Sequence, residues 1–173
     1  MTFIIVSLLD PNNRTRDLKD ILNNLGKEFR KVASPDCVES VKLLAESKAE
    51  SLPDPDRNWD WKATPFKFSF NRMNKDPGYF GSYVMDAMTI GLHVLYHTHS
   101  FEEAIIKAVN MHGNADSIGA VVGQMAGAWY GIQQIPKSWI RVLWQWDHGE
   151  IALRGLMLSR LASHKSYVID PPK

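Results

Sequence analysis

Three oxygen-bearing side chains lie close together near the middle of the chain, in the turn His112-Gly113-Asn114-Ala115-Asp116-Ser117. Asn114, Asp116 and Ser117 are spaced i, i+2 and i+3, so an amide, a carboxylate and a hydroxyl can present three oxygens to one point. Oxygen ligands of this kind suit a hard cation such as Mg²⁺, which also keeps several of its waters. The pattern therefore predicts a cation site in which Asp116 is the charged ligand.

The same turn also has a simpler structural interpretation. Asp116 and Ser117 are residue types that are favoured at helix N-caps. A helix N-terminus has unpaired N–H groups and a partial positive charge, which such side chains satisfy. Gly113 allows the chain to turn sharply before them. The spacing alone leaves both interpretations open, a cation site and a helix cap.

The apolar segment after this turn is predicted to be the helix that positions the three side chains. Its large residues fall at helical spacing: Ile118, Val121, Val122, Met125 and Trp129. Four glycines recur every fourth residue and share one face: Gly119, Gly123, Gly127 and Gly131. Each glycine inside a helix costs about 0.5–1 kcal/mol relative to alanine. We therefore expect a central helix with a neighbouring backbone packed against the glycine face.

The rest of the chain is predicted to be helical except for one irregular stretch. Apolar periodicity predicts helices over residues 17–31, 37–51, 81–97, 101–109 and 150–163, and a further helix that begins near Pro136. Ser100 and Glu103 form a capping box before the helix over 101–109. Prolines interrupt residues 52–78, where the alternating aromatics of residues 66–70 fit either a short strand or a packed loop. The expected fold class is all-α.

Length, charge and cysteine content narrow the class of protein. A chain of 173 residues is the size of one domain. A net charge of +1 without a basic run argues against a nucleic-acid partner. The single Cys37 cannot form an intrachain disulfide, which is typical of a cytoplasmic protein. No signal peptide is predicted, and the apolar helix from Ile118 is shorter than the roughly 20 residues of a membrane span.

A second pair of candidate ligands lies on the helix predicted over residues 81–97. His93 and His97 are four residues apart, so their rings can share a metal ion such as Zn²⁺. The zinc-hydrolase pattern, however, requires a glutamate directly after the first histidine, and Val94 occupies that position. The two residues are therefore interpreted either as core or surface histidines or as a histidine-based metallohydrolase site.

The segment from Gly78 to Trp139, together with residues 150–154, resembles the C-terminal half of the ADP-ribosylglycohydrolase family. The family pattern is A-V-N-x-G-G-D-x-D-S/T-x-G-A-x-x-G-Q-x-A-G-A-x-Y-G, followed by I-P-x-x-W. The matching residues here are Ala108, Val109, Asn110, Gly113, Asp116, Ser117, Gly119, Ala120, Gly123, Gln124, Ala126, Gly127, Ala128, Tyr130, Gly131, Ile135, Pro136 and Trp139.

This resemblance implies a compact multi-helix bundle of which the chain holds the C-terminal half, over residues 57–173, after an N-terminal helical region over residues 1–56. It implies hydrolysis of the N- or O-glycosidic bond between ADP-ribose and an acceptor, with a pair of Mg²⁺ ions. Asp116 and Ser117 stand at metal-ligand positions of the family, and Asn114 replaces the first aspartate. Asp116 would be the catalytic residue, both as ligand and as electrostatic anchor.

Other features of the family have no counterpart in this sequence. Its remaining metal ligands include an Asp-Asp pair in an N-terminal segment, and this chain contains no Asp-Asp. The alternative is therefore a non-catalytic helical subunit or interaction protein on the same scaffold. Expected partners are ADP-ribose or an ADP-ribosylated protein, and a chain carrying the N-terminal half or a second copy. Half a fold should expose apolar surface on the helices that begin near Gly81 and Ile118, which favours association.

Overall fold

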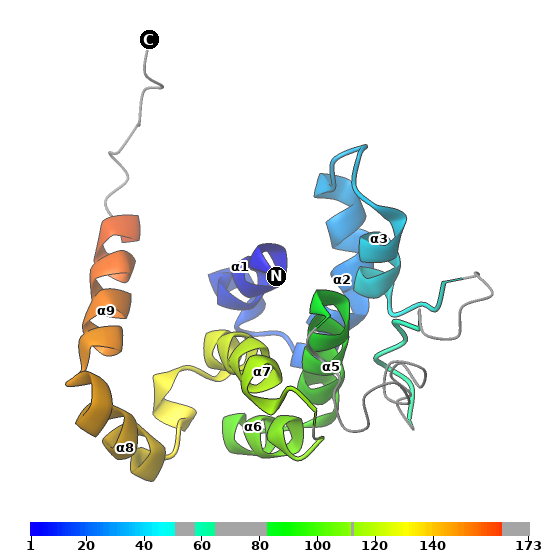
Figure 1. Cartoon of the computed structure of the whole chain (residues 1–173). Helices are drawn as coiled ribbons and strands as arrows, with labels where there is room; N and C mark the ends of the chain where they lie inside the picture. The colour runs from blue at the N-terminus through cyan, green and yellow to red at the C-terminus, as the bar shows by residue number, and fades with distance from the viewer. Residues whose placement is uncertain (51–57, 65–82, 112, 164–173) are drawn as a thin grey trace. The chain divides into compact units, whose positions relative to one another are not determined.

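The computed structural model describes residues 1–50, 58–64, 83–111 and 113–163, and these residues confirm the all-α fold class (Figure 1). The helices are α1 (Thr2–Leu9), η1 (Pro11–Asn13), α2 (Leu18–Val32), α3 (Glu39–Glu46), α5 (Val84–His97), α6 (Phe101–Val109), α7 (Ala115–Tyr130), η2 (Ile132–Gln134), α8 (Lys137–Asp147) and α9 (Glu150–Ser163). Within the described ranges the only β-type pairing is an isolated bridge between Ala49 and Asn58. The strand considered for residues 66–70 lies outside them.

The chain divides into two compact units, residues 1–134 and residues 135–173. The first contains the helices from α1 to η2, and the second contains α8 and α9. The boundary proposed from the sequence, between residues 56 and 57, stays a prediction. None of the helices in the described part of the chain is both long and apolar enough to cross a bilayer.

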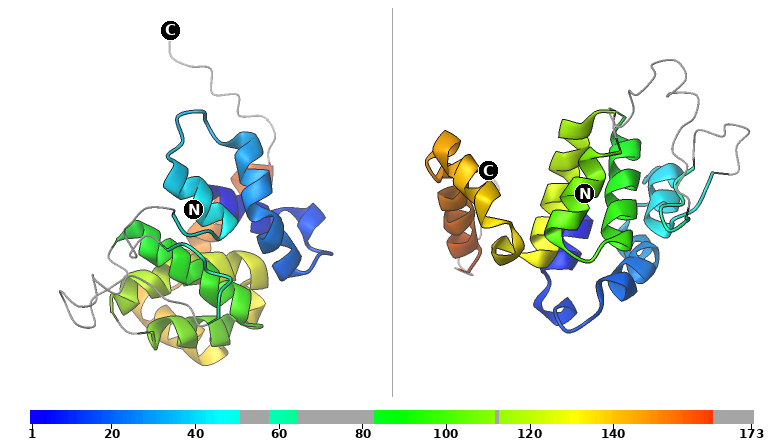
Figure 2. Two further views of the ribbon diagram at one scale, coloured as in Figure 1. Left: turned by 90° about the vertical axis from the view of Figure 1, so that its right-hand side faces the viewer. Right: turned by 90° about the horizontal axis from the view of Figure 1, so that it is seen from below.

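In the first unit α7 is central, as the sequence predicts. It packs against α1, α5 and α6, while α2 and α3 pair with each other and both contact α5 (Figure 2). Ile118, Val122 and Met125 of α7 are fully buried. Helix α5 is buried even more completely, since every residue from Met85 to Leu95 is inaccessible to solvent or nearly so. The apolar side chains of α5 are therefore interior apart from Tyr83 and Val84 at its start, whereas α7 is buried on one side and half-buried at positions such as Val121 and Trp129.

Side chains of α6, not its backbone, cover the glycine face of α7. A Cβ atom built on each glycine would meet an ordinary van der Waals neighbour: Val109 Cγ1 at 3.5 Å from Gly119, Ile105 Cδ1 at 3.7 Å from Gly123 and Phe101 Cε2 at 4.0 Å from Gly127. The expected backbone contact is thus wrong, and α6 runs antiparallel to α7. Gly131 is not part of this face, because it adopts a φ of +76° and ends the helix.

Local capping sets several helix ends that the sequence predicts. The Asp17 carboxylate accepts a hydrogen bond from the Lys19 N–H at 2.6 Å at the start of α2. At the start of α6 the Ser100 hydroxyl accepts from the Glu103 N–H at 3.1 Å. The reciprocal bond of the capping box is displaced by one residue, since the Glu103 carboxylate accepts from the N–H of His99 at 2.8 Å.

Helix α3 is shorter than the helix predicted over residues 37–51. Ser47 adopts a left-handed φ of 59° and ends it. The Ser47 hydroxyl donates to Asp60 Oδ1 at 2.8 Å and accepts from the Lys62 N–H at 2.9 Å. These contacts with a distant segment compensate for the strained backbone, and the same segment buries Trp59 and Trp61. The aromatic packing expected for this stretch is therefore present in residues 58–64.

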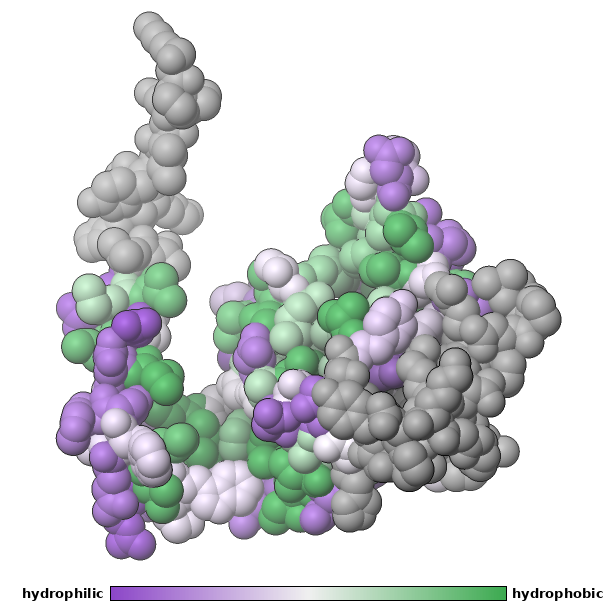
Figure 3. All heavy atoms as spheres, viewed as in Figure 1, coloured by the Kyte–Doolittle hydropathy of each residue, from purple (hydrophilic) through white to green (hydrophobic). Residues whose placement is uncertain are grey.

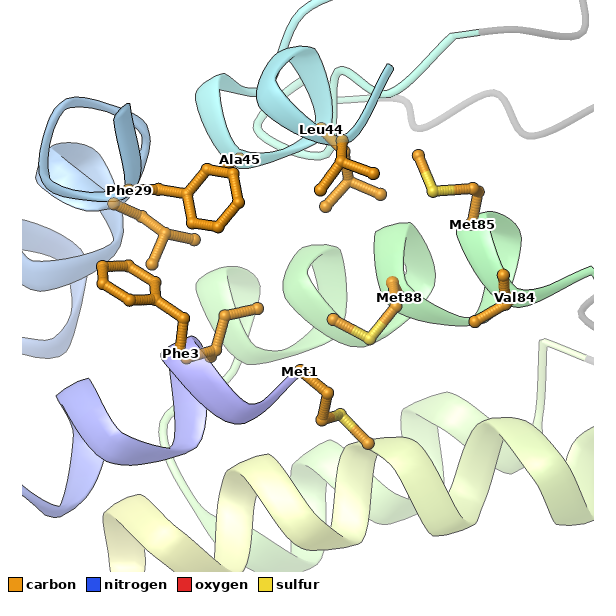
Figure 4. A pocket seen from close by; sticks show the side chains of 11 residues that line it. Met1, Phe3, Phe29, Leu44, Ala45, Val84, Met85 and Met88 are labelled. Atoms are coloured by element: carbon orange, nitrogen blue, oxygen red, sulfur yellow. The ribbon is translucent and has the colours of Figure 1, made fainter. Parts of the chain in front are cut away.

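An apolar cavity of about 230 Å³ lies between α1, α2, α3 and α5 of the first unit. Figure 4 shows Phe3 and Phe29 at one side and Met85 and Met88 at the other, all facing the same space. Only apolar side chains line it, so the cavity offers shape and hydrophobic surface without a polar side chain for chemistry.

Candidate functional site

The three predicted ligands occupy the N-terminus of α7. Asn114 is its N-cap residue, and Asp116 and Ser117 are the second and third residues of its first turn. Gly113 adopts a φ of +71°, which produces the sharp turn that the sequence predicts. The fold thus keeps an amide, a carboxylate and a hydroxyl within one helical turn, at the end of the most central helix of the unit.

The N-cap interpretation of Asp116 and Ser117 is wrong in its detail. The helix begins two or three residues earlier than these caps would place it, because the Ile118 N–H already donates to the Asn114 carbonyl oxygen at 3.0 Å. Asn114 is the cap residue, yet its side chain makes no capping hydrogen bond. Asp116 Oδ1 instead accepts from the N–H of Ser117 at 2.8 Å. One carboxylate oxygen is therefore held in place by the backbone of the first turn.

The oxygens of this turn are of the chemical type that a hard cation prefers, and the cation site stays a prediction. Asp116 and Ser117 are exposed to solvent and Asn114 is half-buried, so a cation could reach them and retain several waters. Only Asp116 carries a full charge, and the positive end of the α7 dipole offsets part of it. Among the described residues no three His, Cys, Asp or Glu side chains gather as a metal site. A second cation would need carboxylates beyond those of this turn.

Asp86 is a carboxylate that the sequence reasoning missed. The Tyr130 hydroxyl donates to the Thr98 carbonyl oxygen at 3.4 Å, which places the C-terminal ends of α5 and α7 together. Gly91 in the middle of α5 also faces Met125 in the middle of α7. Because the two helices meet both at their middles and at their C-terminal ends, they run in the same direction. Asp86, in the first turn of α5, therefore lies at the same end of the unit as the first turn of α7.

The signal for Asp86 was present in the sequence. It is the one charged residue in the apolar run from Tyr83 to Leu92, and it is 3% exposed. Acidic side chains are almost never fully buried unless they are paired. A single acid inside an uninterrupted apolar stretch therefore indicates a specific interior role.

His93 is buried and His97 is half-buried, and their ring centroids lie 4.5 Å apart in the same unit. His93 Nδ1 is 2.9 Å from the Trp61 carbonyl oxygen. Burial lowers the pKa of His93 to about 4, and burial also lowers the pKa of His97, with the positive charge of Lys107 acting in the same direction on both. The burial of His93, its contact with a carbonyl oxygen and the nearby positive charge of Lys107 favour the interpretation of His93 as a core histidine and of His97 as a histidine at the edge of the core.

Comparison with known proteins identifies the scaffold. The sequence model of the ADP-ribosylglycohydrolase family matches residues 1–165. The chain belongs to the ADP-ribosylglycohydrolase family. The match includes residues 1–56, in which no family motif was apparent. No solved structure matches the chain.

The names of the relatives that the chain resembles describe hydrolases of ADP-ribosylated molecules. It is 39% identical over 66 residues to the ADP-ribosyl-(dinitrogen reductase) glycohydrolase of Rhodospirillum rubrum, and this alignment covers 38% of this chain and 22% of that protein. It is 41% identical over 63 residues to the ADP-ribosylarginine hydrolase Tri1 of Serratia proteamaculans (strain 568), covering 36% and 17%. The ADP-ribosylhydrolase ARH3 of Homo sapiens is 38% identical over 40 residues, covering 23% and 11%. The alignments thus span less than a quarter of each relative.

Proposed function

We propose that this chain takes part in hydrolysis of the N- or O-glycosidic bond between ADP-ribose and an acceptor. The observation that carries the proposal is the position of Asn114, Asp116 and Ser117, which share one turn at the start of the central helix of a family member. The proposed partner is ADP-ribose or an ADP-ribosylated protein of the cytoplasm, in line with the names of the relatives.

In this proposal the three side chains hold Mg²⁺, and Asp116 provides the negative charge. A bound Mg²⁺ would supply positive charge to the ribose hydroxyls and orient a water molecule. Asp116 acts as ligand and electrostatic anchor, with one of its oxygens fixed by the Ser117 N–H. Asn114 and Ser117 add neutral oxygens. Because the turn carries a single carboxylate, we expect it to bind one ion with low affinity.

Calorimetric titration with Mg²⁺ tests the metal site. Asn114→Asp adds a second carboxylate to the turn, so it should tighten Mg²⁺ binding by about tenfold, because cation affinity rises with the charge of the ligands. Asp116→Asn should abolish the binding. Asn24→Asp, on the exposed face of α2, makes the same change of charge away from the site and should leave the affinity unchanged. Equal affinities for wild type and Asn114→Asp would show that the turn is only the start of a helix.

Release of ADP-ribose tests the reaction itself. The test substrate is an ADP-ribosylated arginine, chosen because two relatives are named ADP-ribosylarginine hydrolases. We expect Mg²⁺-dependent release that Asp116→Asn eliminates.

The second candidate function is a non-catalytic helical subunit. The lack of any group of three acidic, histidine or cysteine ligands among the described residues favours it. Binding heats distinguish the two functions. If neither Mg²⁺ nor ADP-ribose produces heat, with the chain alone or beside the N-terminal half of a relative, the chain is a scaffold without this chemistry.

A further inference from the structure

We draw no further inference here: the strongest candidate, the apolar cavity between α1, α2, α3 and α5, carries none because nothing in the part of the chain that the structure describes shows what covers it, or what covers the apolar side chains along α8 and α9 (Figure 3).

Discussion

Polar side chains inside α5 illustrate how single residues are accommodated in this apolar unit. The Thr89 hydroxyl donates to the Met85 carbonyl oxygen at 2.6 Å, one turn earlier in the same helix. His93 uses a different solution, a contact between Nδ1 and the Trp61 carbonyl oxygen. Both arrangements satisfy a buried polar group without a charge, which is why they are compatible with a helix that is buried on all sides.

The buried His93 makes stability dependent on pH. Its pKa is about 4 in the folded chain and 6.5 when unfolded, so between these values the unfolded state binds more protons. The contribution of His93 to the free energy of unfolding should be constant above pH 6.5 and fall as the pH decreases from 6.5 through 4, by on the order of 3 kcal/mol.

Urea titrations at several pH values measure this effect. His93→Gln should remove most of the dependence, and a smaller part should remain because the pKa of His97 is lowered too. The control His99→Gln changes an exposed histidine two residues beyond α5 and should retain the full effect. An unchanged pH profile in His93→Gln would contradict the assignment to the buried imidazole.

At the scale of elements, the contacts of each glycine decide whether it is required. Gly119, Gly123 and Gly127 of α7 have room for a methyl group against α6. Gly26 of α2 has none, since an added Cβ would lie 2.8 Å from the Cα of Glu46 in α3. The same residue type therefore marks a tolerant contact between α6 and α7 and a tight one between α2 and α3.

Alanine substitutions at these glycines should have opposite effects. Gly123→Ala should raise the free energy of unfolding by about 0.5–1 kcal/mol, because alanine is the better helix former and the site can hold its methyl group. Gly26→Ala should lower it by about 1–3 kcal/mol, because backbone atoms must move. Thermal or urea unfolding measures both. A loss of stability in Gly123→Ala would show that α6 approaches α7 more closely than described.

At the scale of the first unit, Arg14 links the start of the chain to the end of α7. Its guanidinium donates to the carbonyl oxygens of Trp129 at 2.6 Å and Ala128 at 3.1 Å, and it lies 5.9 Å from the centre of the Trp129 ring. These are carbonyls of the last turn, which lack partners within the helix and favour a positive charge.

Loss of this paired contact should destabilise the unit. Arg14→Lys keeps the charge but cannot donate two parallel hydrogen bonds, so we expect the free energy of unfolding to fall by about 1 kcal/mol. Arg16→Lys is the control, because Arg16 donates only to Asn13, three residues away. Chemical unfolding monitored by tryptophan fluorescence measures the difference. Equal stability of the two variants would show that the Arg14 contact is energetically neutral.

Local sequence determined most of the helices and the position of the candidate site. Periodicity, the Asp17 and Ser100 caps and the sharp turn at Gly113 depend on residues within about four positions of one another, so they could be predicted for α2, α5, α6, α7 and α9. The family resemblance indicated Asn114, Asp116 and Ser117, and these residues do share one helical turn.

Other features were decided only by the tertiary structure. Helix α3 ends at Ser47 because Asp60 and Lys62 bind its hydroxyl. Asp86 shares an end of the unit with α7 because the two helices run in the same direction, and α5 is buried because α2, α3, α6 and α7 all pack against it. Each depends on contacts between residues far apart in the chain. Helix propensity and capping are local, whereas burial depends on which surfaces meet.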